Sequence, residues 1–224
     1  MSAETQTIAA QEIVYPESDG KPMADNTKQF RWIVTIQGGL DALFKDDPNV
    51  FVAGDLLWYA VEGQPSIRLA PDVMVVFGRP KGDRGSYQQW REDGIAPQVV
   101  FEVLSPGNTL PEMLEKLRFY ERYGCEEFYL YDPDRGALSG WIGGNGDLTT
   151  IETINDWLSP RLGVRFQLID GELQLYYPDG RRFESYVELE RSRSRAQQQA
   201  DQERARAERL AAQLRALGIA PDEG

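Results

Sequence analysis

The sequence predicts an α/β fold, with a mixed β-sheet flanked by helices and a long helix at the C-terminal end. Three observations support this fold class. Short apolar runs rich in valine and phenylalanine alternate with segments of helical periodicity. Hydrophobic residues make up 41% of the chain, which is enough for a proper core. From residue 184 onward no proline or glycine occurs before Gly218, and strong helix formers dominate.

The first half of the chain is expected to hold one helix and three strands. Residues 1–26 are polar and carry turn signals, so they are expected to form a flexible segment. Apolar residues at helical spacing predict an amphipathic helix over 27–44, which the glycine pair at 38–39 could interrupt. The stretch 78–97 is long for a loop in a compact domain, so it is either functional or mobile. The expected strands are 49–59, 71–77 and 98–104.

The second half is expected to hold a helix followed by a meander of strands. The helix ends near Tyr123, and Gly124 is well placed as its C-terminal cap. The glycine-rich residues 143–146 are interpreted as a hairpin turn. The expected strands are 127–131, 138–142, 148–154, 164–168 and 173–177. The globular domain is therefore expected to span 27–183.

The C-terminal segment 184–224 is predicted to be a long helix. Its apolar seam is narrow and consists mostly of alanine, with leucine at 210, 214 and 217. The seam fits a short coiled coil, and it fits equally an extended, solvated helix that frays.

Two acids in apolar strands are the strongest functional signal. Asp72 begins the run Pro-Asp-Val-Met-Val-Val-Phe, and Glu102 lies within Val-Val-Phe-Glu-Val-Leu. A lone acid is costly to bury unless a cation or a polar partner accompanies it. Two acids on adjacent strands can share one hard divalent cation, which prefers oxygen ligands. Lys116 follows on the next helix, and acid, acid and lysine in this order suit metal-assisted phosphodiester hydrolysis.

Each of these residues also has a simpler interpretation. Asp72 alone could be a strand-edge acid that is bonded to neighbouring backbone. Lys116 could be a solvated helix residue paired with Glu112, four positions earlier. Gln98 and Ser105 flank the Glu102 strand and read either as supports of the site or as ordinary polar residues at strand ends.

Three stretches carry a resemblance to a known family. They read APDVMVVFGRPKGDRGSYQQW, APQVVFEVLSPGNTLPEMLEKLRFYERYGCEEFYLYDPDRG and LGVRFQLIDGELQLYYPDGRRF. Together they resemble the bacterial Uma-type family of restriction endonucleases, within the PD-(D/E)XK superfamily, over about residues 15–183. The sequence departs from the superfamily pattern at Leu104, where a lysine is usual, and the resemblance implies that Lys116 takes over that role.

The resemblance implies a restriction-endonuclease-like fold and a metal-dependent endonuclease that acts on nucleic acid, with DNA favoured. Asp72 and Glu102 would hold Mg²⁺ or Mn²⁺, together with the backbone carbonyl of Val103. Asp55 is a fourth candidate ligand, because it lies on the strand expected to pair with the Asp72 strand. Nucleases of this kind commonly act as dimers, so a homodimer is a further expectation.

Composition narrows the alternatives. The chain has no histidine, which excludes histidine general bases and histidine metal sites. Cys125 is the single cysteine, so an intramolecular disulfide is excluded. No run approaches the roughly 20 apolar residues of a membrane span, and the first residues lack a signal-peptide pattern. A cytoplasmic protein with no membrane segment is expected.

The net charge of −12 opposes broad nucleic-acid binding and supports a rival hypothesis. Most of the acidity belongs to residues 1–182, which hold 28 acids and 17 bases. A nuclease with this charge needs a local basic strip, for which Lys81, Arg84 and Arg91 are candidates. The rival hypothesis is a catalytically inactive module with the same fold, which binds a partner or acts as a scaffold through its C-terminal helix.

Overall fold

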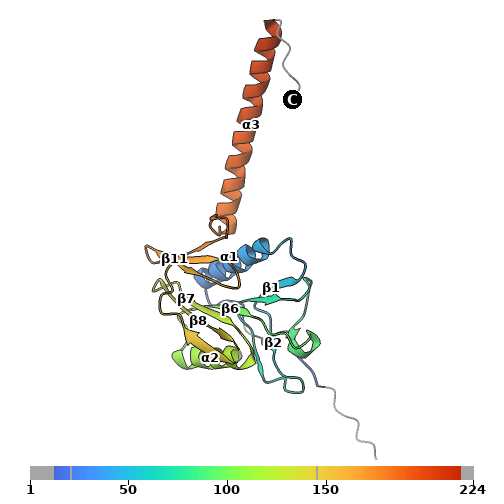
Figure 1. Ribbon diagram of the computed structural model, residues 1–224, viewed down its shortest axis with the longest axis vertical. Helices are drawn as coiled ribbons and strands as arrows, with labels where there is room; N and C mark the ends of the chain where they lie inside the picture. The colour runs from blue at the N-terminus through green and yellow to red at the C-terminus, as the bar shows by residue number, and fades with distance from the viewer. Residues whose placement is uncertain (1–12, 21, 145, 218–224) are drawn as a thin grey trace, which may run out of the picture. The chain divides into compact units, whose positions relative to one another are not determined.

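A computed structural model describes residues 13–20, 22–144 and 146–217. These residues fall into two compact units, which divide between Phe183 and Glu184. The first unit holds the sheet and two of the helices, and the second is the C-terminal helix (Figure 1). The expected flexible segment 1–26 lies partly outside the described residues, at 1–12 and 21.

A six-stranded mixed sheet forms the centre of the first unit, in the order β1-β4-β6-β7-β8-β9. Its neighbouring strands are antiparallel except for β6 and β7, which run parallel because the helix α2 connects them. The strands are β1 (Val50–Gly54), β4 (Val73–Phe77), β6 (Val99–Val103), β7 (Glu127–Asp132), β8 (Ala137–Gly144) and β9 (Asp147–Thr150). The predicted mixed sheet flanked by helices is therefore confirmed.

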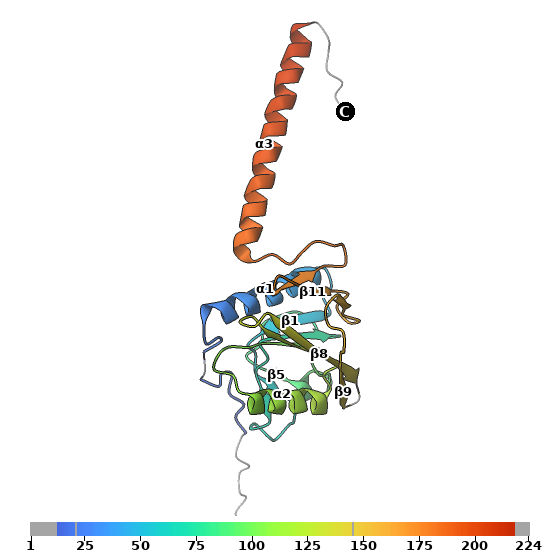
Figure 2. The same ribbon diagram turned by 90° about the vertical axis from the view of Figure 1, so that its left-hand side faces the viewer.

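Each face of this sheet is covered by one helix and one small sheet (Figure 2). On one face lie α1 (Thr27–Leu43) and the sheet of β10 (Trp157–Leu158), β11 (Arg165–Ile169) and β12 (Glu172–Tyr176). On the other face lie α2 (Leu110–Tyr123) and the sheet of β2 (Trp58–Tyr59), β3 (Arg68–Leu69) and β5 (Tyr87–Gln88). Because side chains alternate along a strand, every central strand contributes to both cores.

Capping residues define the two helices of the first unit. The Asn26 side chain accepts backbone N–H groups at the start of α1, and Thr109 and Glu112 form a capping box on α2. Gly124 ends α2 in the left-handed conformation, as its position suggested. The glycine pair at 38–39 does not interrupt α1. Gly39 instead makes room for the Phe183 ring, which would collide with a β-carbon at that position.

The expected strand over 49–59 is divided into β1 and β2. Asp55, just after β1, has a φ of +48°, and this left-handed residue turns the chain away from the central sheet. β2 then pairs with β3 and β5 in the separate small sheet. The expected strand over 148–154 also ends early, at Thr150, although the Ile151 N–H still donates to the Gly140 carbonyl of β8.

The stretch 78–97 is more ordered than a long loop. It contains β5 and the 3-10 helix η1 (Gln89–Arg91). Arg79 and Arg84 both form ion pairs with Glu92 and so close the stretch on itself. The described part of the N-terminal segment, 13–20, has no helix or strand, but the Tyr15 ring packs against Tyr59 and Trp90.

The second unit consists of α3 (Tyr186–Ala216), a helix of 31 residues. Ser185 and Glu188 form a capping box at its start, and no residue of α3 is buried. None of the helices in the described ranges combines the length and the apolar character that a membrane-spanning segment requires.

Candidate active site

The register of β4 and β6 brings the two strand acids together. Val73 pairs with Phe101 and Met74 with Val100, so one further step of the same ladder sets Asp72 opposite Glu102. Asp72 lies two residues from Met74, and Glu102 lies two residues from Val100, so each acid shares a face of the sheet with its apolar neighbour. Met74 and Val100 belong to the core beneath α2. Both carboxyl groups therefore lie on the face of the sheet that α2 covers. Asp72 is 9% exposed and Glu102 is 3% exposed.

Asp72 bonds directly to the strand that carries Glu102. Its Oδ2 accepts the backbone N–H of Val103 at 2.6 Å. In the described part of the chain, the one buried side-chain oxygen or nitrogen without a partner is Gln88 Oε1. The second oxygen of Asp72, Oδ1, has no hydrogen bond to another described residue. The Asp72 carboxyl group thus anchors β4 to β6 and still presents one oxygen to a ligand.

Glu102 is bonded through both of its oxygens to α2. Its Oε2 lies 2.6 Å from the Nζ of Lys116, and its Oε1 accepts the hydroxyl of Tyr120. Lys116 and Tyr120 are four residues apart, so they lie on the same face of α2. The Lys116 side chain is 23% exposed. The structure therefore brings Asp72, Glu102 and Lys116 into one place, while Glu112 bonds Thr109 and its charge also acts on Lys116.

The Val103 carbonyl faces the same edge of β6. It accepts the side-chain amide of Gln29, from the first turns of α1, at 2.8 Å. A carbonyl oxygen has two lone pairs, so this bond leaves it able to accept a second partner. Gln29 is buried, and its own oxygen accepts the backbone N–H of Asp25.

Asp55 lies at the margin of the site. Its backbone N–H donates to the carbonyls of Pro71 and Asp72, which fixes it beside the start of β4. Its side chain is exposed. Within the described ranges, no three acidic or cysteine side chains are gathered closely enough to form a metal site from side chains alone. Any cation site here would therefore depend on Asp72, Glu102 and backbone oxygen, with Asp55 close by.

Burial and neighbouring charges together raise the pKa values of Asp72, Lys116 and Tyr120. Burial raises the pKa of Asp72 well above its usual range, and the Glu102 charge adds to the effect, while Lys116 and the Val103 N–H oppose it. Burial alone would lower the pKa of Lys116, but the charge and the hydrogen bond of Glu102 outweigh burial and raise it. Lys116 is therefore an ammonium at neutral pH. Burial, and then Glu102, raise the pKa of Tyr120 well above its usual range.

Partial burial raises the pKa of Asp55 as well, with Asp19 adding to the shift. Lys116 opposes this shift and Glu102 adds to it. Asp55 therefore belongs to the same electrostatic neighbourhood as the two strand acids, although within the described residues its side chain has no hydrogen bond to theirs.

The bases proposed as a basic strip are mostly neutralised. Lys81 pairs with Asp41, and Arg84 pairs with Glu92 while its guanidinium lies 4.0 Å from the centre of the Phe51 ring. Arg91 is exposed, on η1.

The polar residues at the ends of β6 serve local structure. Gln98 bonds the backbone of Phe77, and Ser105 bonds Asp25 and Asn108.

Two residues of the site have no prediction from the sequence. Tyr120 follows Lys116 at a spacing of four, which could have indicated a shared face of the helix. Gln29 carries a weaker signal: it is a polar residue three and four positions before the apolar residues Trp32 and Ile33. In the structure all three are buried.

These features define a restriction-endonuclease-like α/β protein, with an acid on each of two neighbouring strands and a lysine on the following helix. A profile of the Uma2 family, described as a putative restriction endonuclease, matches residues 21–169. The chain belongs to the Uma2 family, as the sequence resemblance indicated.

A search of curated proteins finds no match. Among solved structures, the chain is similar to the crystal structure of a putative nuclease belonging to DUF820 from Anabaena variabilis. That similarity has a TM-score of 0.46 and 16% sequence identity, and it covers 64% of this chain and 79% of the other.

Proposed function

We propose that this protein is a metal-dependent endonuclease that hydrolyses phosphodiester bonds in nucleic acid, with DNA as its substrate. The observation that carries the proposal is the meeting of Asp72 and Glu102 on neighbouring strands, with Lys116 bonded to Glu102. Membership of a family described as a restriction endonuclease supports the same activity.

The donor set fits Mg²⁺ or Mn²⁺. It consists entirely of oxygen, from Asp72, Glu102 and the Val103 carbonyl, and hard divalent cations prefer such ligands. The open Oδ1 of Asp72 and the second lone pair of the Val103 carbonyl are available to such an ion, and Asp55 is proposed as a further ligand. When bound, the cation would offset negative charge on the phosphodiester and activate water as a nucleophile.

The protein's own groups have distinct tasks in this proposal. The Lys116 ammonium donates hydrogen bonds toward the attacking water and toward the phosphate oxygens, whose charge grows in the transition state. It acts as a charge and a donor rather than as a base, because it remains protonated at neutral pH. Tyr120 holds Glu102 in place from the other side, which makes it a positioning residue.

Cleavage of supercoiled plasmid tests the proposal. We expect nicked and linear products with Mg²⁺ or Mn²⁺ and none with EDTA. Glu102→Gln and Lys116→Met should each reduce the rate by at least about 100-fold, the usual effect of removing an electrostatic or acid–base group. Glu115→Gln and Arg118→Gln, at exposed positions of the same helix, are the matched controls and should cleave as the wild type does. A plasmid left intact, or a Glu102→Gln variant as active as the wild type, would refute the catalytic assignment.

One observation favours the rival function of an inactive binding module. Both oxygens of Glu102 are engaged within the protein, and Leu104 occupies the usual position of the lysine. A buried pair of this kind can serve structure alone. Thermal unfolding with added Mn²⁺ separates the two functions, because an ion that binds only the folded state raises Tm. A rise in the wild type that is absent in Asp72→Asn supports the metal site, and equal behaviour of both proteins supports the structural role.

A further inference from the structure

The C-terminal helix differs in charge from the rest of the protein. The whole chain has a net charge of −12, yet α3 carries seven arginines against five acids. Excess positive charge on an exposed helix attracts a polyanion electrostatically. The question is therefore whether these arginines are spread around the helix or gathered on one face.

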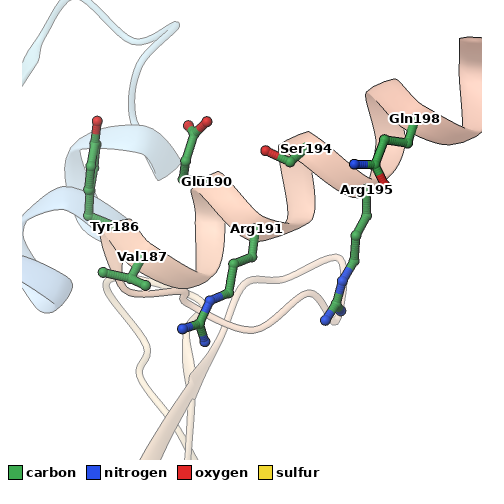
Figure 3. A pocket seen from close by; sticks show the side chains of 7 residues that line it. All are labelled: Tyr186, Val187, Glu190, Arg191, Ser194, Arg195 and Gln198. Carbon is green, nitrogen blue, oxygen red and sulfur yellow. The ribbon is translucent and has the colours of Figure 1, made fainter.

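Four of the arginines share one face of α3. At about 100° per residue, Arg191, Arg195, Arg206 and Arg209 fall within an arc of roughly 60°. We call these four residues the arginine stripe. Figure 3 shows Arg191 and Arg195 extending to the same side of the helix, with Glu190 directed away from them. The remaining arginines at 193, 204 and 215 lie on the opposite side, where Glu190, Asp201 and Glu208 also lie.

The arginine stripe is exposed and, within the described ranges, forms no ion pair with Glu190 or Glu203, the acids that line the same stretch of α3. All four side chains are exposed, and none of them forms an ion pair within the described ranges. Arg209 donates only to the Ala205 carbonyl of its own helix. Glu188, the acid that shares this arc, is engaged in the capping box with Ser185. The stripe therefore differs from Lys81 and Arg84, which already pair with carboxylates.

Uncharged hydrogen-bonding groups continue the same face. Gln198 and Gln202 lie between the two pairs of arginines. Two surface hollows of about 420 and 500 Å³ follow one another along α3 and share Arg195 and Gln198 as lining residues, and Glu190 lines the first and Glu203 the second. Arginine and glutamine side chains are common partners of phosphate oxygens in protein–DNA complexes. The stripe spans about 27 Å of helix, the length of roughly eight base pairs.

We propose that the arginine stripe of α3 binds the phosphate backbone of duplex DNA. This inference rests on the proposed function, because the choice of duplex DNA as the polyanion follows from it. The stripe supplies the local positive charge that an endonuclease with an acidic domain requires and that the bases near the active site do not provide. α3 is thus the DNA-holding element of the protein, and chemistry is confined to the first unit.

The test is the affinity of the full-length protein for a fluorescent duplex of about 20 base pairs, longer than the stripe itself. Fluorescence anisotropy is measured in EDTA over a range of salt concentrations. Arg195→Gln/Arg206→Gln removes two stripe charges. Its matched control, Arg193→Gln/Arg204→Gln, removes two charges with the same spacing from the opposite side of α3. Arg191→Gln/Arg209→Gln is a second stripe pair, and circular dichroism checks that each variant remains helical.

We expect both stripe variants to bind more weakly, with a salt dependence (log K against log salt concentration) that is less steep by about 2, close to 1 per lost phosphate contact. The control should lose markedly less affinity. Equal losses in the stripe and control variants would mean that only net charge matters and would overturn the proposal, as would an unchanged affinity in the stripe variants. Tighter binding of a single-stranded RNA of the same length would overturn the assignment to duplex DNA.

This outcome is separable from the fate of the proposed activity. Binding in EDTA requires neither metal nor cleavage. A protein that binds DNA through the stripe but never cuts it would support the DNA-binding surface and refute the catalytic assignment. Stripe variants that bind duplex DNA and cleave plasmid as the wild type does would support the active site and refute the role of the stripe in DNA binding.

Discussion

Asp72 makes the stability of the protein depend on pH in a defined direction. Its pKa is raised in the folded state, mainly by burial, so the folded protein holds this proton to a higher pH than the unfolded chain does. The free energy of unfolding therefore decreases as pH rises from the ordinary value of 3.8 through the folded pKa. In the absence of metal, an ionised Asp72 therefore destabilises the folded protein, although it lies at the start of the central strand β4.

We expect Asp72→Asn to raise Tm at neutral pH in EDTA. Asparagine keeps an oxygen that can accept the Val103 N–H, but it has no charge to bury. Each 1 kcal/mol gained should raise Tm by roughly 2–4 °C in a protein of this size. The gain should shrink as pH falls from the folded pKa toward about 4, because the wild-type carboxyl group is then neutral in the folded and the unfolded state alike. Scanning calorimetry over this pH range measures the gain, with Asp83→Asn at an exposed position as control. A gain that is independent of pH would contradict the assigned cause.

Much of the site could be predicted at the level of single residues. Asp72, Glu102 and Lys116 were recognisable because a charged residue in or beside an apolar run requires a partner. Tyr120 and Gln29 were not predicted as site residues, because tyrosine and glutamine fit ordinary positions of an amphipathic helix. Their role follows only from which atoms of β6 they meet, and this depends on tertiary packing.

At the scale of elements, the long strands and the helices were predictable and the short strands were not. The valine-rich runs of β4 and β6, and the capped helix α2, carry strong local signals. The two-residue strands β2, β3, β5 and β10 carry almost none, because two residues are too few to show an alternating pattern. The division of 49–59 depended on the left-handed Asp55, and the sequence does not distinguish that aspartate from any other turn residue.

The glycine pair of α1 offers a matched test of packing. Gly38→Ala should stabilise the protein by about 0.5–1 kcal/mol, because alanine favours the helix and nothing lies within 4 Å of the new β-carbon. Gly39→Ala should destabilise it by about 1–3 kcal/mol, since the new β-carbon would meet a ring atom of Phe183 at 2.1 Å. Urea unfolding measures both. Changes of the same sign would show that helix propensity, and not the Phe183 contact, determines the result.

At the scale of the whole molecule, we propose that any homodimer forms mainly through the first unit. The apolar seam of α3 consists largely of alanine, and alanine buries little area at about 25 cal/mol per Å². Leu210, Leu214 and Leu217 are exposed and give the seam only a short stretch of leucine near its end. The seam alone should therefore be too weak to hold two chains together firmly.

Light scattering on the variant Leu210→Glu/Leu214→Glu tests this view of assembly. Where the wild type is dimeric, the variant should remain largely dimeric at the same concentration. A fully monomeric variant beside a dimeric wild type would show that the seam dominates and that the proposal is wrong.

The position of Lys116 on the helix that joins β6 to β7 has a consequence for the order of folding. Lys116 and Tyr120 reach Glu102 over 14 and 18 residues of chain, whereas Asp72 reaches Val103 over 31. Shorter loops cost less entropy to close, so the strand–helix–strand segment can assemble its buried charge pair before β4 arrives. We expect Lys116→Met to slow refolding in stopped-flow experiments, and Asp72→Asn to change mainly the unfolding rate. The lysine half of the site then forms as a local unit, and Asp72 joins it only when the central sheet closes.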